Sequence, residues 1–405
     1  AHGEVLGHAY HGLVDGGVAV GVELAHDLAY DTGALLMGRG VVDAHLAHGG
    51  LIARIQSQLI ADVVAIFLNV IGAGLRDISG ALNAVNGVLN AIQSFFQNTV
   101  YPLDAINRAN PTPHLGSIEA TNPCGEIPLL PFESCNLGSI NLAHMLRRVE
   151  GRPAVDWEKF ASTVHVATRF LDDVIEVSKY PVPEIEEMTR GNRKIGLGVM
   201  GFAEMLIRLG ISYATDEAVQ AADKIAQFIA LEAEQASKAL AEERGVFPHW
   251  KGSALEAKGI KVRNATRTAI APTGTIGIIA GTSPSIEPLF ALAYRRSHVL
   301  GEQTLYEVNP LLLEFLERHG LKAQEVLDRV LQTGSIRDVA GIPEELKQPF
   351  VTALEIGAEQ HLRIQSAFQR HVDNSVSKTV NLPHEATIED VADTYRLAWE
   401  LGLKG

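Results

Sequence analysis

Two stretches of the 405-residue chain carry a clear helical pattern of apolar positions. Apolar residues recur every three or four positions from Asp156 to Ser178, which predicts a helix with one buried face. A second, alanine-rich helix is predicted from Asp216 to Arg244, with Thr215 or Asp216 as its N-terminal cap and Gly245 as its end. The predicted buried stripe of the first helix consists of Phe160, Val164, Ala167, Leu171, Val174 and Ile175.

Three acidic residues lie near the end of the first predicted helix, at Asp172, Asp173 and Glu176. Carboxylates in such a group can bind a metal ion, but on an amphipathic helix they more often form the solvated face. We therefore expect all three side chains to face water.

Glycine and proline mark the ends of shorter apolar runs. Gly196, Gly198 and Gly201 lie in a predicted strand-to-helix transition, where their spacing partly resembles a dinucleotide-binding fingerprint. Without a βαβ unit after it that spacing is a weak signal, so a close-packed structural segment is the preferred interpretation. A strand is also predicted over Asp373–Pro383, and a capping box at Thr387–Asp390 predicts a last helix that runs to Leu401.

Residues 1–100 differ in composition from the rest of the chain. They contain no Lys and no Pro, and they include six His within the first fifty positions. Helical periods are predicted near residues 51–70 and 78–96, and the remainder has no clean period. The histidines lack the spacing and the partner residues of a metal site, so none is predicted. They are His2, His8, His11, His26, His45 and His48.

The composition restricts the partners of the chain. A formal net charge of −14 argues against a nucleic-acid surface, which needs clustered basic residues. The most apolar window, residues 59–75, is too short and too polar for a membrane span. Two cysteines and the lack of a signal peptide indicate a reducing cytoplasm.

The chemically densest stretch of the chain is residues 121–142, which holds both cysteines and three prolines. Asn122, Cys124 and Glu126 alternate along it, so an extended backbone would place an amide, a thiol and a carboxylate on one face. Pro123 and Pro128 argue against a helix and favour a braced, extended loop.

Each cysteine also has ordinary interpretations. A free Cys is most often a small buried apolar residue. A disulfide between Cys124 and Cys135 is sterically feasible but disfavoured in a reducing compartment. A metal site is weaker still, since two thiols without a paired His do not complete a tetrahedron.

A second motif runs from Thr268 to Pro288. An apolar strand at Ala269–Ala271 stops at Pro272, and small residues then open a short helix. The unpaired backbone N–H groups of such a turn suit a phosphate, although an ordinary capped turn has the same pattern. The candidate phosphate-binding residues are Pro272, Thr273, Gly274, Thr275 and Ile276.

From about Tyr101 to Gly405 the sequence closely resembles the large subunit of ribonucleotide reductases, in the adenosylcobalamin-dependent (class II) form. The resemblance rests on Asn-Pro-Cys-Gly-Glu at 122–126 and on Glu-Ser-Cys-Asn-Leu-Gly-Ser-Ile-Asn-Leu at 133–142. Small departures are Ile127, where glutamine is common in the family, and Phe132, where tyrosine is common.

The resemblance implies a role for each residue of the loop. Cys124 would form the thiyl radical that takes the 3′ hydrogen of the substrate ribose, and Glu126 would be the general base on the 3′ hydroxyl. Asn122 would hold the ribose hydroxyls, and Cys135 would be half of the dithiol that reduces the 2′ carbon. The turn at residues 272–276 would hold the substrate phosphates.

The resemblance also implies a fold, which is part of a ten-stranded α/β barrel with an active-site finger loop. Residues 101–405 would form this catalytic part, preceded by a mainly helical or irregular, non-homologous segment at residues 1–100. The implied partners are adenosylcobalamin, a ribonucleotide, a dithiol reductant such as thioredoxin, nucleotide effectors and a second copy of the chain.

Two alternatives remain open. One is a class I large subunit driven by a separate radical-generating protein. The other is a catalytically inactive nucleotide-binding fragment, because the family's thiol partner for Cys135, its recharging dithiol tail and the first half of its barrel are not found in the sequence.

Overall fold

The structure is a computed structural model that describes residues 103–299, 303–321 and 323–404. The chain divides into two compact units, Ala1–Ser94 and Phe95–Gly405, and the described residues belong to the second. The predicted helices near 51–70 and 78–96 and the six histidines lie outside the described residues.

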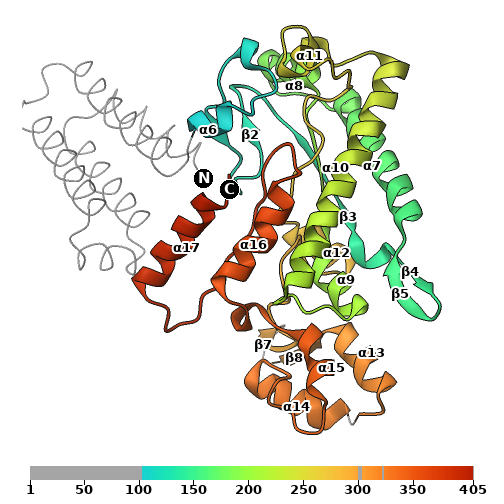
Figure 1. The fold of residues 1–405 in the computed structure, drawn as a ribbon, viewed down its shortest axis with the longest axis vertical. Coiled ribbons are helices and arrows are strands. Elements are labelled where there is room, and N and C mark those ends of the chain that lie inside the picture. The colour runs from blue at the N-terminus through green and yellow to red at the C-terminus, as the bar shows by residue number, and fades with distance from the viewer. Residues whose placement is uncertain (1–102, 300–302, 322, 405) are drawn as a thin grey trace, which may run out of the picture. The chain divides into compact units, whose positions relative to one another are not determined.

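The described unit combines runs of helices with runs of short strands (Figure 1). The strands are β1 (Ala120–Thr121), β2 (Pro128–Leu129), β3 (Asn136–Asn141), β4 (Leu146–Val149), β5 (Arg152–Val155), β6 (Ile195–Met200), β7 (Ala293–Val299) and β8 (Gln303–Val308). The α-helices are α6 (Leu103–Asn107), α7 (Trp157–Val177), α8 (Pro183–Asn192), α9 (Phe202–Leu209), α10 (Asp216–Arg244), α11 (Ala254–Ala257), α12 (Gly274–Ala280), α13 (Pro310–Arg318), α14 (Ala323–Thr333), α15 (Glu344–Lys347), α16 (Ala358–Gln369) and α17 (Ile388–Glu400).

Parallel chain segments form the centre of this unit. β3 pairs with β6 in parallel, from Asn136 opposite Ile195 to Asn141 opposite Met200. The sheet continues through parallel bridges from Leu197 to Thr268 and from Ile270 to Val376. All six residues of β6 are buried, as expected for a parallel strand covered on both faces.

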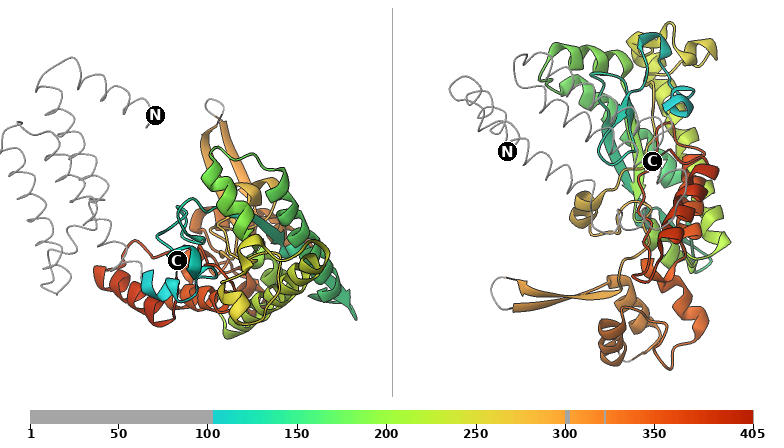
Figure 2. Two further views of the ribbon diagram at one scale, coloured as in Figure 1. Left: turned by 90° about the horizontal axis from the view of Figure 1, so that it is seen from above. Right: turned by 90° about the vertical axis from the view of Figure 1, so that its left-hand side faces the viewer.

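The main hydrophobic core lies between these segments and a layer of helices. Figure 1 shows α10 between α7 and α16, and apolar residues of all three helices pack with β6. The core includes Phe160, Leu171, Leu197, Val199, Ile225, Ile229, Ile364 and Phe368. A smaller cluster joins α13 and α14 to the chain near Leu292 and Phe350, and Figure 2 shows the β7–β8 hairpin extending beside it.

Three predicted helices are confirmed together with their ends. Asp156 caps α7 by accepting a hydrogen bond from the backbone N of Lys159 at 3.1 Å. α10 begins and ends at the predicted residues, after Thr215 and before Gly245. The capping box of Thr387 and Asp390 opens α17. Each helix end was predictable because its cap is a local feature of the sequence.

The glycines of β6 confirm the close-packed interpretation. A Cβ atom at Gly198 would lie 2.2 Å from the carbonyl oxygen of Ala269, and one at Gly196 would lie 2.6 Å from Leu137 Cδ2. Gly201, with a φ of 74°, then precedes α9. These glycines allow the neighbouring parallel segment to approach the strand.

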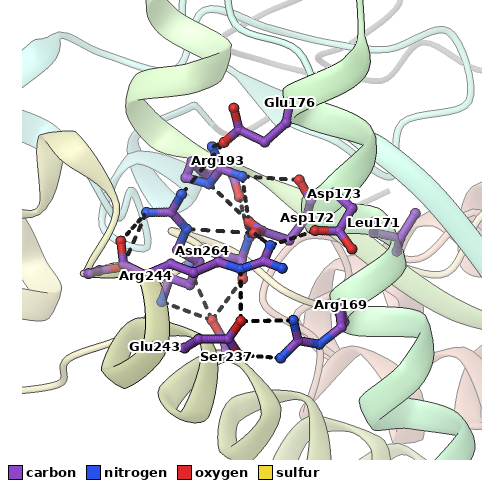
Figure 3. A network of polar contacts seen from close by, with 12 residues as sticks. Arg169, Leu171, Asp172, Asp173, Glu176, Arg193, Ser237, Glu243, Arg244 and Asn264 are labelled. Atoms are coloured by element: carbon purple, nitrogen blue, oxygen red, sulfur yellow. Dashed lines mark hydrogen bonds and ion pairs between the residues drawn. The ribbon is translucent and has the colours of Figure 1, made fainter.

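The expected solvated face of α7 is wrong for Asp172, which is fully buried. Figure 3 shows its carboxylate among side chains from other elements. Arg193 Nε and Asn264 Nδ2 each donate to Asp172 Oδ1 at 2.9 Å, and Arg244 Nη1 lies 3.3 Å from Oδ2. Glu176 is exposed, as predicted. Arg193 and Arg244 make burial of the Asp172 carboxylate feasible because they neutralise its charge. Both lie outside the helix of Asp172, so the periodicity of that helix could not predict them.

The strand predicted over Asp373–Pro383 is also wrong for most of its length. Val376 forms one bridge with Ile270, while the other residues of the range have no regular strand pairing among the described residues. Within the described ranges no helix is long and apolar enough to cross a membrane.

Candidate active site

The first cysteine lies at the tip of a short hairpin. β1 and β2 pair antiparallel, with Ala120 opposite Leu129 and Thr121 opposite Pro128. The turn between them closes through a 3.0 Å hydrogen bond from Gly125 N to Asn122 O, and Gly125 has a φ of 79°. The expected extended backbone over residues 122–126 is therefore wrong, because Gly125 adopts the left-handed conformation that reverses the chain.

The hairpin gives its three candidate side chains different surroundings. Cys124 is exposed, and its thiol is free. Asn122 is half-buried, and its Oδ1 accepts a 2.9 Å hydrogen bond from Ile127 N, so its side chain holds the turn. Glu126 is only 1% exposed, and its Oε2 atom has no hydrogen-bond partner. An enclosed carboxylate oxygen without a donor is available to accept a proton from a ligand.

The second cysteine, Cys135, directly precedes β3 and is half-buried. Burial raises the pKa of its thiol from 9.0 to about 12. The ammonium group of Lys194 opposes this shift, and the carboxylates of Glu133 and Glu126 add to it. Cys135 is therefore a thiol at neutral pH, close enough to Glu126 to respond to its charge.

The alternatives for the cysteines can be compared with this geometry. Both cysteines are free, so they form no disulfide. In the described part of the chain no group of three His, Cys, Asp or Glu side chains could hold a metal ion.

Sequence reasoning missed Glu133 and Lys194, which form an ion pair beside Cys135. Lys194 Nζ lies 2.6 Å from Glu133 Oε2, and both side chains are almost fully buried. The signal in the sequence was a lysine directly before the apolar strand β6 and a glutamate two residues before Cys135. Buried charges are rarely found unpaired, so each indicated a partner without identifying it.

The candidate phosphate turn has the predicted strand-to-helix form. Thr273 has a φ of 50°, and α12 begins at Gly274. Gly274, Thr275 and Ile276 are exposed, so the first turn of the helix is open to a ligand. Thr273 Oγ1 instead accepts a 2.7 Å hydrogen bond from Ser285 N and braces the turn from behind.

The cysteine hairpin and the phosphate turn are joined through a shared neighbour, Ser375. Its N donates to Glu126 O at 2.8 Å, and its O accepts from Ile270 N at 3.1 Å. Ile270 is two residues before Pro272, where the turn begins. The two motifs are therefore attached to adjacent parallel segments.

Parallel strands backed by helices, with a thiol and an enclosed carboxylate on an inserted hairpin, define an α/β domain with a cysteine site. The sequence model of the protein family described as "Ribonucleotide reductase, barrel domain" matches residues 88–261 and 254–405. The chain belongs to this family, and its fold is part of that barrel.

Two related proteins each match this chain over 303 residues, which is 75% of its length. A vitamin B12-dependent ribonucleoside-diphosphate reductase of Thermoplasma acidophilum is 55% identical, and the match covers 39% of that protein. One of the same name from Mycobacterium tuberculosis (strain CDC 1551 / Oshkosh) is 52% identical, with 43% covered. The chain thus spans about two fifths of the length of these relatives.

A solved structure agrees with the fold. The alpha subunit of the class Id ribonucleotide reductase of Actinobacillus ureae is 27% identical to the chain, with a TM-score of 0.61. The match covers 75% of this chain and 56% of that subunit.

Proposed function

We propose that the chain reduces ribonucleotides to 2′-deoxyribonucleotides by thiyl radical chemistry. The observation that carries this proposal is the enclosed carboxylate of Glu126, whose Oε2 has no donor, two residues after the exposed thiol of Cys124. A hydrogen-abstracting sulfur and a base must reach adjacent atoms of one sugar, and this hairpin provides both groups.

In this reaction Cys124, as a thiyl radical, takes the 3′ hydrogen atom of the ribose while Glu126 takes the 3′ hydroxyl proton. The 2′ hydroxyl leaves as water with a proton from Cys135. The second thiol then gives a hydrogen atom to the 2′ carbon, and its sulfur bonds to that of Cys135. This sulfur pair passes one further electron to the 3′ carbonyl, whose oxygen takes back the proton from Glu126, and so becomes a disulfide. Cys124 then returns a hydrogen atom to the 3′ carbon. One dithiol is oxidised for each ribonucleotide reduced.

The given sequence has two cysteines, Cys124 and Cys135, and neither of them is the second thiol of this dithiol. An external dithiol such as thioredoxin has the required chemistry. Because burial holds Cys135 in its thiol form, this residue can donate a proton to the leaving hydroxyl at neutral pH.

The proposed radical source is adenosylcobalamin, in line with the names of the two relatives. Cys124 is exposed at the hairpin tip, so its sulfur can be reached by a large group, which fits this cofactor. When bound, adenosylcobalamin would supply the radical that converts Cys124 to its thiyl form.

The exposed N-terminal turn of α12 is the proposed site for the substrate phosphates. Backbone N–H groups at Gly274, Thr275 and Ile276 are not used by preceding helical carbonyls, and the positive end of the helix dipole favours an anion.

The remaining elements of the proposal concern the whole protein. Residues 101–405 form the catalytic unit, and residues 1–100, of which the family match includes only 88–100, form a separate segment. The protein acts in the cytoplasm, supplies precursors for DNA replication, responds to nucleotide effectors and forms a homodimer.

Turnover and equilibrium binding together test the proposal. The 405-residue chain is incubated with a ribonucleoside diphosphate, adenosylcobalamin and a dithiol, and deoxyribonucleotide is measured by chromatography. We expect product from the unaltered chain and a loss of about 10²-fold to 10⁴-fold in Glu126→Gln, because general-base catalysis contributes that much. Cys124→Ser should give no product and should still bind the nucleotide.

Each alternative predicts a different outcome. Strict dependence on a second protein rather than on adenosylcobalamin would identify a class I subunit. Nucleotide binding without turnover under any of these conditions would contradict the proposal and identify an inactive nucleotide-binding fragment.

A further inference from the structure

The buried pair of Glu133 and Lys194 connects three parts of the chain around the cysteine loop. Glu133 Oε2 accepts hydrogen bonds from Lys194 Nζ at 2.6 Å and from Leu130 N at 2.9 Å. Glu133 Oε1 accepts from Asn192 Nδ2 at 2.6 Å, and Lys194 Nζ also donates to Pro128 O at 3.3 Å. The pair thereby ties the arm that returns from Cys124 to the arm that leads to Cys135 and to the start of β6.

The pair is not explained by stability alone. A buried ion pair is often no more stabilising than apolar residues of the same volume, because both charges lose their hydration. Lys194 and Glu133 are 1% and 7% exposed. The effect of the pair therefore comes from its charges and hydrogen bonds rather than from added stability.

The charges lie where they act on the Cys135 thiol. A lysine ammonium beside a cysteine ordinarily converts the thiol to a thiolate. Here the carboxylate of Glu133 lies against that ammonium and offsets its field. Among the described residues, the charged groups that act on this sulfur are Lys194, Glu133 and Glu126.

We propose that Glu133 and Lys194 are positioning residues for Cys135: they hold the two cysteine-bearing arms together, and because Glu133 offsets the charge of Lys194, the Cys135 sulfur remains the proton-carrying thiol that its buried position favours. The role in turnover rests on the proposed function. In the reaction above, a thiolate at Cys135 would have no proton for the leaving 2′ hydroxyl.

The test measures the alkylation of Cys135 by iodoacetamide against pH in the 405-residue chain. Peptide mass spectrometry separates it from Cys124. When the pKa of a thiol falls by one unit, the fraction present as thiolate rises tenfold at a pH below the pKa, but each thiolate becomes less nucleophilic. The rate of alkylation therefore rises by about threefold for each unit by which the pKa falls. We expect Glu133→Gln to speed alkylation at a fixed pH below the pKa and Lys194→Met to slow it. Lys194→Arg, which keeps the charge, should resemble the unaltered chain.

The two single variants shift the alkylation rate in opposite directions, so either one decides the test if the other fails to fold, and a double variant serves as the control. Glu133→Gln with Lys194→Met removes both charges at similar volume, so it should fold and alkylate at a rate between those of the single variants. Foldedness is checked by circular dichroism. A folded Glu133→Gln or Lys194→Met variant whose alkylation profile coincides with that of the unaltered chain would overturn the proposal and leave the pair a purely structural contact.

Alkylation and turnover distinguish the two proposals. If the unaltered chain makes no deoxyribonucleotide but the signed alkylation shifts appear, the proposed function fails while the action of the pair on Cys135 stands. If turnover occurs but the alkylation shifts are absent, the proposed function stands and the action of the pair on Cys135 fails. Where both succeed, Glu133→Gln should lower kcat more than it raises KM, because Cys135 acts after the substrate binds.

Discussion

Burial and nearby charges both act on the thiol of Cys135. Burial raises its pKa from 9.0 to about 12, so folding favours the protonated form of this side chain. The unfolded chain loses the proton near pH 9, whereas the folded chain keeps it up to about pH 12. Stability from this group is therefore fully present below pH 9 and is lost as the pH rises through that interval.

A comparison with Cys135→Ser isolates this contribution. Between pH 9 and about pH 12, the free energy of unfolding of the unaltered chain should fall relative to the variant by about 1.4 kcal/mol per pH unit. Urea titrations at several pH values measure the difference. Parallel pH profiles for the two proteins would contradict an enclosed thiol at this position.

At the scale of elements, the close approach of β6 to its neighbouring segment depends on glycine. Gly198→Ala would place a Cβ 2.2 Å from Ala269 O, a backbone atom that cannot move without shifting its segment. We expect a loss of about 1–3 kcal/mol or more in the free energy of unfolding, measured by denaturant titration. Gly357→Ala is the matched control, since no atom lies within 4 Å of its added Cβ.

The buried carboxylate of Asp172 joins α7 to α10 and to the start of β6 (Figure 3). Asp172→Asn would leave its arginine partners without their buried counter-charge, so the free energy of unfolding should fall by about 3–5 kcal/mol. Thermal unfolding followed by circular dichroism measures this loss.

The control for Asp172 is the exposed pair of Glu243 and Arg169 in the same network. Glu243→Gln should lower the free energy of unfolding far less than Asp172→Asn, because water already solvates both groups. Equal losses in the two variants would show that burial of Asp172 does not determine its contribution.

At the scale of the whole molecule, nucleotide binding should stabilise the chain through the turn that opens α12. A nucleoside diphosphate at one hundred times its Kd should raise the free energy of unfolding by about 2.7 kcal/mol. Gly274 is exposed and has no atom near an added Cβ, so Gly274→Val should leave the unliganded protein folded. Its branched side chain would crowd the phosphate and abolish most of the ligand-induced rise in melting temperature.

Cys124→Ser serves as the control for this prediction. Its exposed side chain lies on the hairpin, so the variant should keep the full ligand-induced shift. An equal shift in Gly274→Val would place the nucleotide phosphates elsewhere.

The features that depend on neighbouring residues were predictable from the amino-acid sequence. The caps of α7 and α17, the end of α10 at Gly245 and the opening of α12 after Pro272 all follow from side chains within one helical turn. The amino-acid sequence of the cysteine loop also indicated the family, and the barrel-domain match confirms it.

The burial of charges and the fold of the cysteine loop depend on contacts between distant parts of the chain, so the three-dimensional structure was needed to identify them. Asp172 has partners 21 and 72 residues away at Arg193 and Arg244, and Glu133 finds Lys194 61 residues away. Such pairs stabilise a buried charge only when folding brings both groups out of water together, so no local pattern contains them. The same holds for the hairpin at Cys124, where strand pairing and Gly125 replace the extended backbone that alternation predicted.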